Sequence, residues 1–392
     1  MLRYSKGKEV ACKIILAIDA GGIRCLIPAM VLAELQRRMR ATGRRLALAR
    51  YVNMFAGAGV GSLLIATFAY ALAPEMAGAA DPDAVIRGFS DAAKFFPKRI
   101  MTSSGVMRLD TNLFEAHLRQ RYGEKTLVSA ANTHVVFPAF DIGNRVPLMI
   151  TNTDPVSSNF YLWQALRGVV AVVPYMSPAL VENRAAARPR GTPLIPLVSG
   201  GRYADDPSLA AYVEARKLGW QEEGITLLSL GAGSELPPIP FINPLSSGGL
   251  DMTDVTEPLL RSADELHCPI ANHVNMLMNG EARAFNGVST RLTLENRRKL
   301  SYFRVNGRLQ ERNQNKVDFG HENIEQLKEE ALRIIADHSA ILDEVVSRMP
   351  TDLEILTRDS RLDTLPPPDP ARRPAEQVGR QTGMPADIAE FI

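Results

Sequence analysis

Short apolar runs alternate with longer amphipathic segments along most of the chain. Runs rich in β-branched side chains are typical of buried strands, and they cover residues 13–18, 51–56, 133–141, 147–152, 194–198 and 225–230. Apolar side chains recur at helical spacing within 27–40, 109–131 and 321–349. Helices alternate with strands, and glycines follow several strands. The pattern therefore predicts an α/β fold with a mostly parallel central sheet and a site along its strand ends.

Three further segments complete this picture. Residues 55–73 carry no charge, and length alone would admit a membrane span, but glycines crowd the start. We interpret them as a turn followed by the buried central helix of the domain. Residues 234–300 lack a strong period and are expected to wrap around the outside. The proline-rich tail, 351–392, is expected to be extended or disordered.

Composition narrows the function classes. The 392 residues carry 45 basic and 43 acidic side chains, well mixed, so nothing favours a nucleic-acid partner. The three cysteines are too scattered for a disulfide framework or a zinc site (Cys12, Cys25 and Cys268). Two neighbouring histidines, His267 and His273, lack metal-ligand spacing. The first eighteen residues mix charged with apolar side chains and contain no signal-peptide core. We expect a cytoplasmic protein without a cofactor.

One glycine turn has the frame of a catalytic element but lacks its reactive group. Residues 57–61 read G-A-G-V-G, which matches the nucleophile elbow G-x-S-x-G with Gly59 in the place of the serine. Such an elbow is a tight turn from strand to helix that raises the central side chain into the site. Its flanking glycines avoid collisions with nearby backbone. Here the glycines are present and the reactive oxygen is absent.

Three glycine-rich turns together resemble one family. Segment 19–25, D-A-G-G-I-R-C, is similar to the loop D-G-G-G-x-R-G of patatin-like phospholipases and lipid acyl hydrolases (PNPLA type). Segment 57–63 falls where that family has G-T-S-T-G-G-L, and 199–207, S-G-G-R-Y-A-D-D-P, where it has D-G-G-x-x-x-N-N-P. Linking segments keep the same order and spacing. The resemblance covers residues 12–340, with a long last helix continuing to about 349.

The resemblance implies a three-layer α/β/α fold and a Ser–Asp dyad. In that family the serine attacks an acyl ester, the aspartate is its base, and backbone amides of the glycine loop hold the oxyanion. Carried over to this chain, the oxyanion hole falls on Gly21, Gly22 and Ile23, followed by the matching Arg24. The nucleophile falls on Gly59 and the dyad aspartate on Ser199, so both halves of the dyad are missing.

Four nearby residues are candidate substitutes, each with a structural alternative. Ser62 is either a replacement nucleophile or a serine that caps or packs the first helical turn. Cys25 stands at a helix N-terminus beside Arg24, a setting that activates thiols, or is a small buried hydrophobe. Asp205 and Asp206 either return a carboxylate to the site or cap a helix that begins at Pro207.

Three functions follow from these residues. The chain is a weak or atypical acyl hydrolase or acyltransferase, or a pseudoenzyme that binds acyl chains or lipid. In the third, the pocket carries out a non-hydrolytic reaction on an acyl or polyketide-like substrate, with the amide-rich hole stabilising an enolate. A branch of plant patatin-like proteins also resembles this chain in having G-x-G-x-G, and lipid acyl hydrolysis is attributed to it. The expected partner is a lipid or other acyl ester, with peripheral membrane contact and an undetermined oligomeric state.

Overall fold

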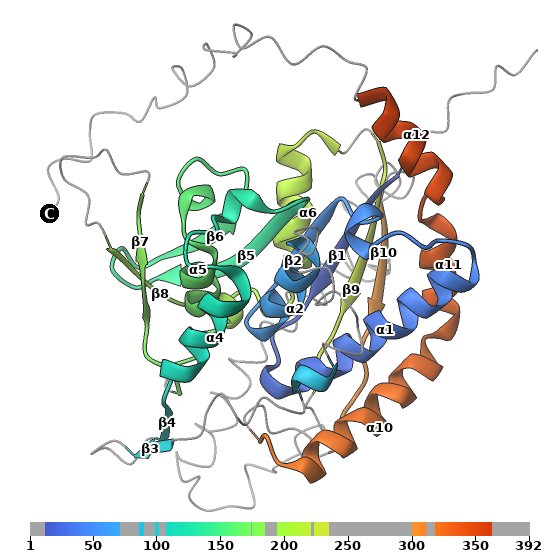
Figure 1. Cartoon of the computed structure of the whole chain (residues 1–392). Helices are drawn as coiled ribbons and strands as arrows, with labels where there is room; N and C mark the ends of the chain where they lie inside the picture. The colour runs from blue at the N-terminus through green and yellow to red at the C-terminus, as the bar shows by residue number, and fades with distance from the viewer. Residues whose placement is uncertain are drawn as a thin grey trace, which may run out of the picture. The chain divides into compact units, whose positions relative to one another are not determined.

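The computed structural model describes residues 12–70, 86–89, 99–101, 107–173, 175–184, 194–220, 223–234, 300–310 and 318–362 (Figure 1). The chain divides into two compact units, Met1–Pro350 and Thr351–Ile392. In the first unit the strands are β1 Lys13–Ile18, β2 Met54–Gly57, β3 Arg99–Met101, β4 Met107–Leu109, β5 His134–Asp141, β6 Val146–Thr151, β7 Ala179–Glu182, β8 Leu194–Ser199, β9 Ile225–Leu230 and β10 Leu300–Val305. Its helices are α1 Leu26–Ala41, α2 Val60–Ala69, α4 Asn112–Tyr122, α5 Leu162–Val169, α6 Ser208–Lys217, α10 His321–Asp337 and α11 Ser339–Arg348.

A mostly parallel sheet forms the centre of the first unit. Within the described residues its order is β10-β9-β1-β2-β5-β8-β7, with β6 also paired to β5. The strands from β10 to β5 run parallel to their neighbours, whereas β6 and β8 are antiparallel to β5. The carboxyl ends of β1, β2, β9 and β10 therefore meet at one edge, where α/β folds place their sites.

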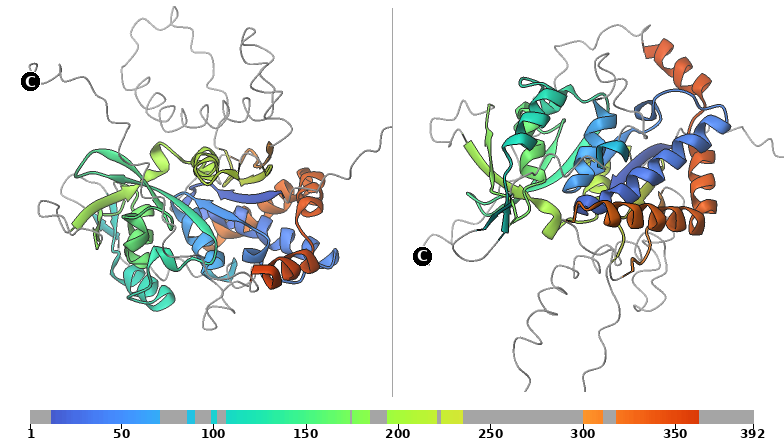
Figure 2. Two further views of the ribbon diagram at one scale, coloured as in Figure 1. Left: turned by 90° about the horizontal axis from the view of Figure 1, so that it is seen from above. Right: turned by 60° about the horizontal axis from the view of Figure 1, so that its bottom comes forward.

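Helices cover both faces of this sheet (Figure 2). Helix α6 packs on one face, while α1, α2 and α5 lie on the other. The α6 face is a cluster in which Ile15 and Ala17 of β1 pack with Ala211 and Trp220. The intervening side chains of β1 are equally buried. A strand buried on both faces explains the continuous apolar run at 13–18, and the predicted α/β fold class is confirmed.

Several boundaries differ from the sequence prediction. The second strand is Met54–Gly57 rather than 51–56, because Tyr51 ends a 3₁₀ turn and its hydroxyl accepts the Leu46 N–H at 2.9 Å. Residues 321–349 form two helices, α10 and α11, that meet at His338. The imidazole Nδ1 of His338 lies 2.9 Å from the carbonyl of Ile334, in the last turn of α10.

The expected extended tail is corrected in part. Residues Asp352–Leu362 form helix α12, which begins with Asp352 and Glu354 in its first turn, where acidic side chains favour a helix. The rest of the tail and most of the segment 234–300 lie outside the described residues, as do His267, His273 and Cys268.

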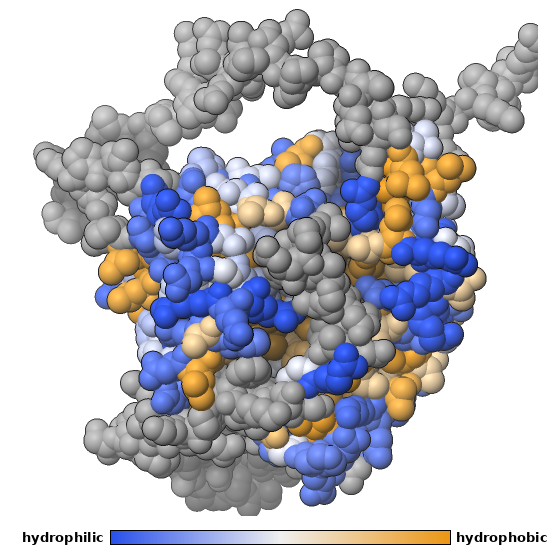
Figure 3. Space-filling view, viewed as in Figure 1, coloured by the Kyte–Doolittle hydropathy of each residue, from blue (hydrophilic) through white to orange (hydrophobic). Residues whose placement is uncertain are grey.

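No helix in the described part is long and apolar enough to cross a membrane. The uncharged stretch that begins at residue 55 contributes β2 and the ten-residue buried helix α2, as predicted, up to the end of the described segment at residue 70. On the face drawn in Figure 3, hydrophilic and hydrophobic residues are interspersed. Leu180 of β7 is 58% exposed.

Candidate functional site

The turn between β2 and α2 has the backbone of a nucleophile elbow. Gly59 lies at φ 48° and ψ −126°, directly before the first residue of α2. A Cβ on Gly57 would lie 2.7 Å from the Cα of Ser62, and one on Gly61 would lie 2.5 Å from the carbonyl oxygen of Asp19. Both contacts are with fixed backbone. The flanking glycines are therefore demanded by the fold, as an elbow requires.

The loop after β1 is a second glycine turn beside the elbow. Gly22 has φ 58°, and Gly22–Cys25 is a 3₁₀ turn that leads directly into α1. A Cβ on Gly21 would collide with the side chain of Ala232. Within the described part of the chain, no acceptor pairs with the N–H groups of Gly21, Gly22 and Ile23. These donors at a helical N-terminus suit a developing oxyanion. Arg24, next in the loop, is 2% exposed.

The third turn follows β8 and begins at Ser199. The Ser199 hydroxyl oxygen accepts the N–H of Gly201 at 3.2 Å. A Cβ on Gly200 would lie 2.6 Å from the backbone of Pro138, so this glycine is also required. The N–H of Ala20 donates to the carbonyl of Asp205 at 3.0 Å and ties the third turn to the loop after β1.

The three turns converge on one point. A Cβ built on Gly59 would lie 3.0 Å from the Cβ of Ala20 and 3.9 Å from the Oγ of Ser199. A Cβ built on Gly201 would lie 3.3 Å from that same methyl group, 3.4 Å from Ser199 Oγ and 3.6 Å from Asp205 Oδ1. The two positions to which the sequence resemblance assigns a dyad, Gly59 and Ser199, therefore face each other.

Two of the candidate substitutes are turned into the core. Ser62 is fully buried, and its hydroxyl donates to the carbonyl of Gly59 at 2.5 Å. Cys25 is also fully buried, and its thiol donates to the carbonyl of Asp19 at 3.6 Å, beneath Gly21. Both side chains therefore hydrogen-bond to backbone carbonyls of the glycine turns on their buried side. Ser199 and Asp205, in contrast, are half-buried.

Asp206 has a different environment from Asp205. Its Oδ1 accepts the N–H of Ser208, the first residue of α6, at 2.9 Å, and the Ser208 hydroxyl also contacts it. Its carboxylate further contacts Ser229 at 3.2 Å, Tyr302 at 3.3 Å and Arg304 at 3.3 Å. Asp206 thus binds the start of α6 and belongs to a polar network with side chains of β9 and β10.

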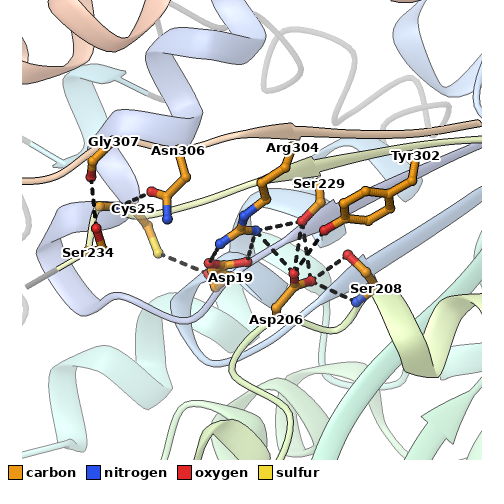
Figure 4. A network of polar contacts seen from close by, with 11 residues as sticks. Asp19, Cys25, Asp206, Ser208, Ser229, Ser234, Tyr302, Arg304, Asn306 and Gly307 are labelled. Carbon is orange, nitrogen blue, oxygen red and sulfur yellow. Dashed lines mark hydrogen bonds and ion pairs between the residues drawn. The ribbon is translucent and has the colours of Figure 1, made fainter. Parts of the chain in front are cut away.

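Arg304 is the centre of that network (Figure 4). Its guanidinium donates to both carboxylate oxygens of Asp19, one at 2.7 and the other at 2.5 Å, and to Ser229 Oγ at 2.6 Å. Burial raises the pKa of Asp19 to about 7, Arg304 acts in the opposite direction, and the charge of Asp206 adds to the rise. The network fixes Asp19, from which the first glycine turn departs.

Sequence reasoning missed Arg304, Ser229 and Tyr302. Strand β10, which carries two of them, begins at the end of the segment 234–300 that was read as irregular. The signal was present in the run L-S-Y-F-R-V. An arginine within a short, mostly apolar strand predicts a buried carboxylate partner, and Asp19 is that partner. In the described residues no cluster of three His, Cys, Asp or Glu side chains could hold a metal ion.

Comparisons with known proteins support a patatin-like family. The chain is similar to Patatin-like protein 2 of rice (Oryza sativa subsp. indica), 28% identical over 165 residues, 38% of each chain. It is 26% identical to Patatin-like protein 6 of Arabidopsis thaliana over 247 residues, 56% of this chain and 46% of that protein. It is also 26% identical to Probable inactive patatin-3-Kuras 1 of potato (Solanum tuberosum) over 239 residues, 56% of this chain and 62% of that protein.

These matches span less than two thirds of each of these relatives. No family model matches the chain. Among solved structures, VipD from Legionella pneumophila aligns with a TM-score of 0.34 and 10% identity, covering 84% of this chain and 67% of that one, a likeness too low to carry an argument.

Proposed function

We propose that residues 12–340, with the last helices continuing to about 349, form a patatin-like domain that acts on the acyl ester of a lipid or related small molecule. The observation that supports this most is the elbow. Gly59 keeps the strained backbone of a nucleophile position, at the start of α2 and facing Ser199.

The site supplies part of acyl-transfer chemistry. The N–H groups of Gly21, Gly22 and Ile23 provide the oxyanion hole, with the buried Arg24 as part of the same loop. Without a serine at position 59, turnover is weak, since removing one member of a catalytic unit typically costs several orders of magnitude. Loss of the usual dyad leaves weak hydrolysis or acyl transfer as the activity. A cytoplasmic setting and peripheral membrane contact accompany this proposal as predictions.

A second candidate is a pseudoenzyme that binds acyl chains or lipid without turnover. Ala20 favours it, because its methyl group lies 3.0 Å from the position of a Cβ on Gly59 and takes the room a nucleophile needs. The potato relative is named "Probable inactive patatin-3-Kuras 1". The third candidate, non-hydrolytic chemistry on an acyl or polyketide-like substrate, relies on the same oxyanion hole.

The test is hydrolysis of p-nitrophenyl acyl esters of graded chain length and of phosphatidylcholine vesicles by the purified protein. Mass spectrometry of lipid extracted from the same preparation accompanies it. Turnover that rises with acyl-chain length supports an acyl hydrolase. Bound lipid without turnover supports the pseudoenzyme. A protein that shows no turnover and carries no bound lipid would contradict the proposal of an acyl-ester site.

A further inference from the structure

We propose that the nucleophile has moved across the site: Ser199 is the attacking residue and Asp205 is its base. This inference rests on the proposed function, because it supplies the reactive oxygen that the elbow lacks. The serine stands where patatin-like proteins have the dyad aspartate, and the carboxylate comes from the same turn after β8. Ser199 stands at the end of β8, and its Oγ faces the glycine of the elbow.

Ser199 is placed for attack in a way that Ser62 and Cys25 are not. Its Oγ faces the elbow, 3.9 Å from the position of a Cβ on Gly59, and the side chain is half-buried. The oxygen accepts the N–H of Gly201 at 3.2 Å, a contact that stabilises negative charge on the oxygen as its proton leaves. Ser62 and Cys25 are fully buried, and each donates a hydrogen bond to a backbone carbonyl instead.

Asp205 brings a carboxylate to the same point. Its Oδ1 and Ser199 Oγ lie 3.6 and 3.4 Å from the position of a Cβ on Gly201. The backbone of Asp205 is held against the glycine loop by the N–H of Ala20. Asp206 binds the start of α6 and Arg304. Catalytic hydrogen bonds are often long in the ligand-free state and tighten when substrate binds, and this pair requires the same of Asp205 and Ser199.

The reaction proceeds in two balanced halves. The Oγ of Ser199 forms a bond to the carbonyl carbon of the ester, its proton passes to Asp205, and the carbonyl electrons move to an oxygen held by the N–H groups of Gly21 and Gly22. Collapse of this intermediate breaks the ester bond, and the alcohol leaves with the proton from Asp205. Water, deprotonated by Asp205, then releases the carboxylic acid and restores the Ser199 hydroxyl.

The experiment is labelling of the full-length protein with an alkyl fluorophosphonate, followed by peptide mapping and by p-nitrophenyl octanoate kinetics. The variants are Ser199→Ala, Asp205→Asn and Ser199→Cys, with Ser347→Ala and Asp337→Asn as matched controls on α11 and α10. We expect the label on the peptide that carries Ser199. We also expect kcat to fall at least about 100-fold in Ser199→Ala and about 100-fold in Asp205→Asn. In Asp205→Asn the plot of rate against pH should lose its fall at low pH, because the base that is protonated there is absent. Ser199→Cys keeps a nucleophile and becomes reactive toward iodoacetamide.

The outcomes separate this inference from the proposed function. Label on Ser199, together with loss of turnover in Ser199→Ala at an unchanged melting temperature, supports the relocated pair. Turnover that survives in Ser199→Ala, or label on Ser62 or Cys25, overturns the pair and leaves an acyl-ester site in place. Bound lipid without label or turnover in the wild type overturns the pair and favours the pseudoenzyme.

Discussion

Gly59 and Ser199 face each other across the site: a Cβ built on the glycine would lie 3.9 Å from the Oγ of the serine. The resemblance to patatin-like proteins places a nucleophile at the first of these positions and its base at the second, and the backbone brings the two positions together. Ala20 lies at the same point, 3.0 Å from that Cβ position. A side chain at position 59 would therefore crowd the methyl group of Ala20, so the size of one residue limits the size of the other.

The coupling predicts how the usual dyad can be restored. Gly59→Ser with Ser199→Asp places the missing side chains, but the Ala20 methyl crowds the new serine. We expect the triple variant with Ala20→Gly to hydrolyse p-nitrophenyl butyrate at least about 10-fold faster than the double variant, since small displacements of a nucleophile are costly. A triple variant with alanine at 59 is the matched control. Equal rates for the double and triple variants would contradict the crowding.

The free energy of unfolding of Gly59→Ala tests whether a side chain at this position is crowded. The φ of 48° at ψ −126° is a backbone conformation that only glycine adopts freely. We expect this substitution to lower the free energy of unfolding by about 1–3 kcal/mol in urea denaturation. Part of the loss reflects contact with the Ala20 methyl and should be recovered in Ala20→Gly/Gly59→Ala. A purely additive double variant would show that backbone strain alone is responsible.

Arg304 is predicted to be essential for the fold. Arg304→Met leaves Asp19 and Asp206 buried beside each other without their cation, and we expect a loss of about 3–5 kcal/mol in the free energy of unfolding. Arg37→Met removes an exposed ion pair with Glu34 and serves as the control, with no measurable change expected. An equally small effect for both variants would contradict the role of the network.

The raised pKa of Asp19 predicts a pH dependence of stability. A folded-state pKa near 7 against an ordinary value of 3.8 means that the folded chain holds this proton more tightly than the unfolded chain does. Stability should therefore fall as pH rises from about 4 to about 7, and then level off. Urea denaturation at pH 5 and pH 8 measures the slope, of order 1 kcal/mol or more. Asp19→Asn should flatten it, and an unchanged slope in this variant would assign the titration elsewhere.

The sequence predicted the fold well wherever burial was two-sided. Strand β1 was predicted with its observed limits, because residues covered by helices on both faces must be continuously apolar. The break at His338 was missed, since the apolar stripe continues across it and only the ring's approach to Ile334 marks the junction. The residues of the second strand were misplaced because Tyr51 is as buried in a turn as in a strand.

The candidate site was predictable in outline only. The glycine turns appear in the sequence because backbone approach forbids other residues at Gly57, Gly61 and Gly200. The run 300–305 indicates a buried partner for Arg304, but the sequence does not identify that partner, because the network joins strands that are adjacent only in the folded sheet. Nor could the sequence tell that Asp205 lies close to Gly201 while Asp206 binds the start of α6.

The central claim is that this edge of the sheet acts on acyl esters through Ser199. The most direct measurement is the rate of p-nitrophenyl octanoate hydrolysis by the wild type and by Ser199→Ala, compared at equal folded concentration. We predict slow turnover by the wild type and a rate at the uncatalysed background for the variant. Equal rates for the two proteins, whether fast or at background, would contradict the account.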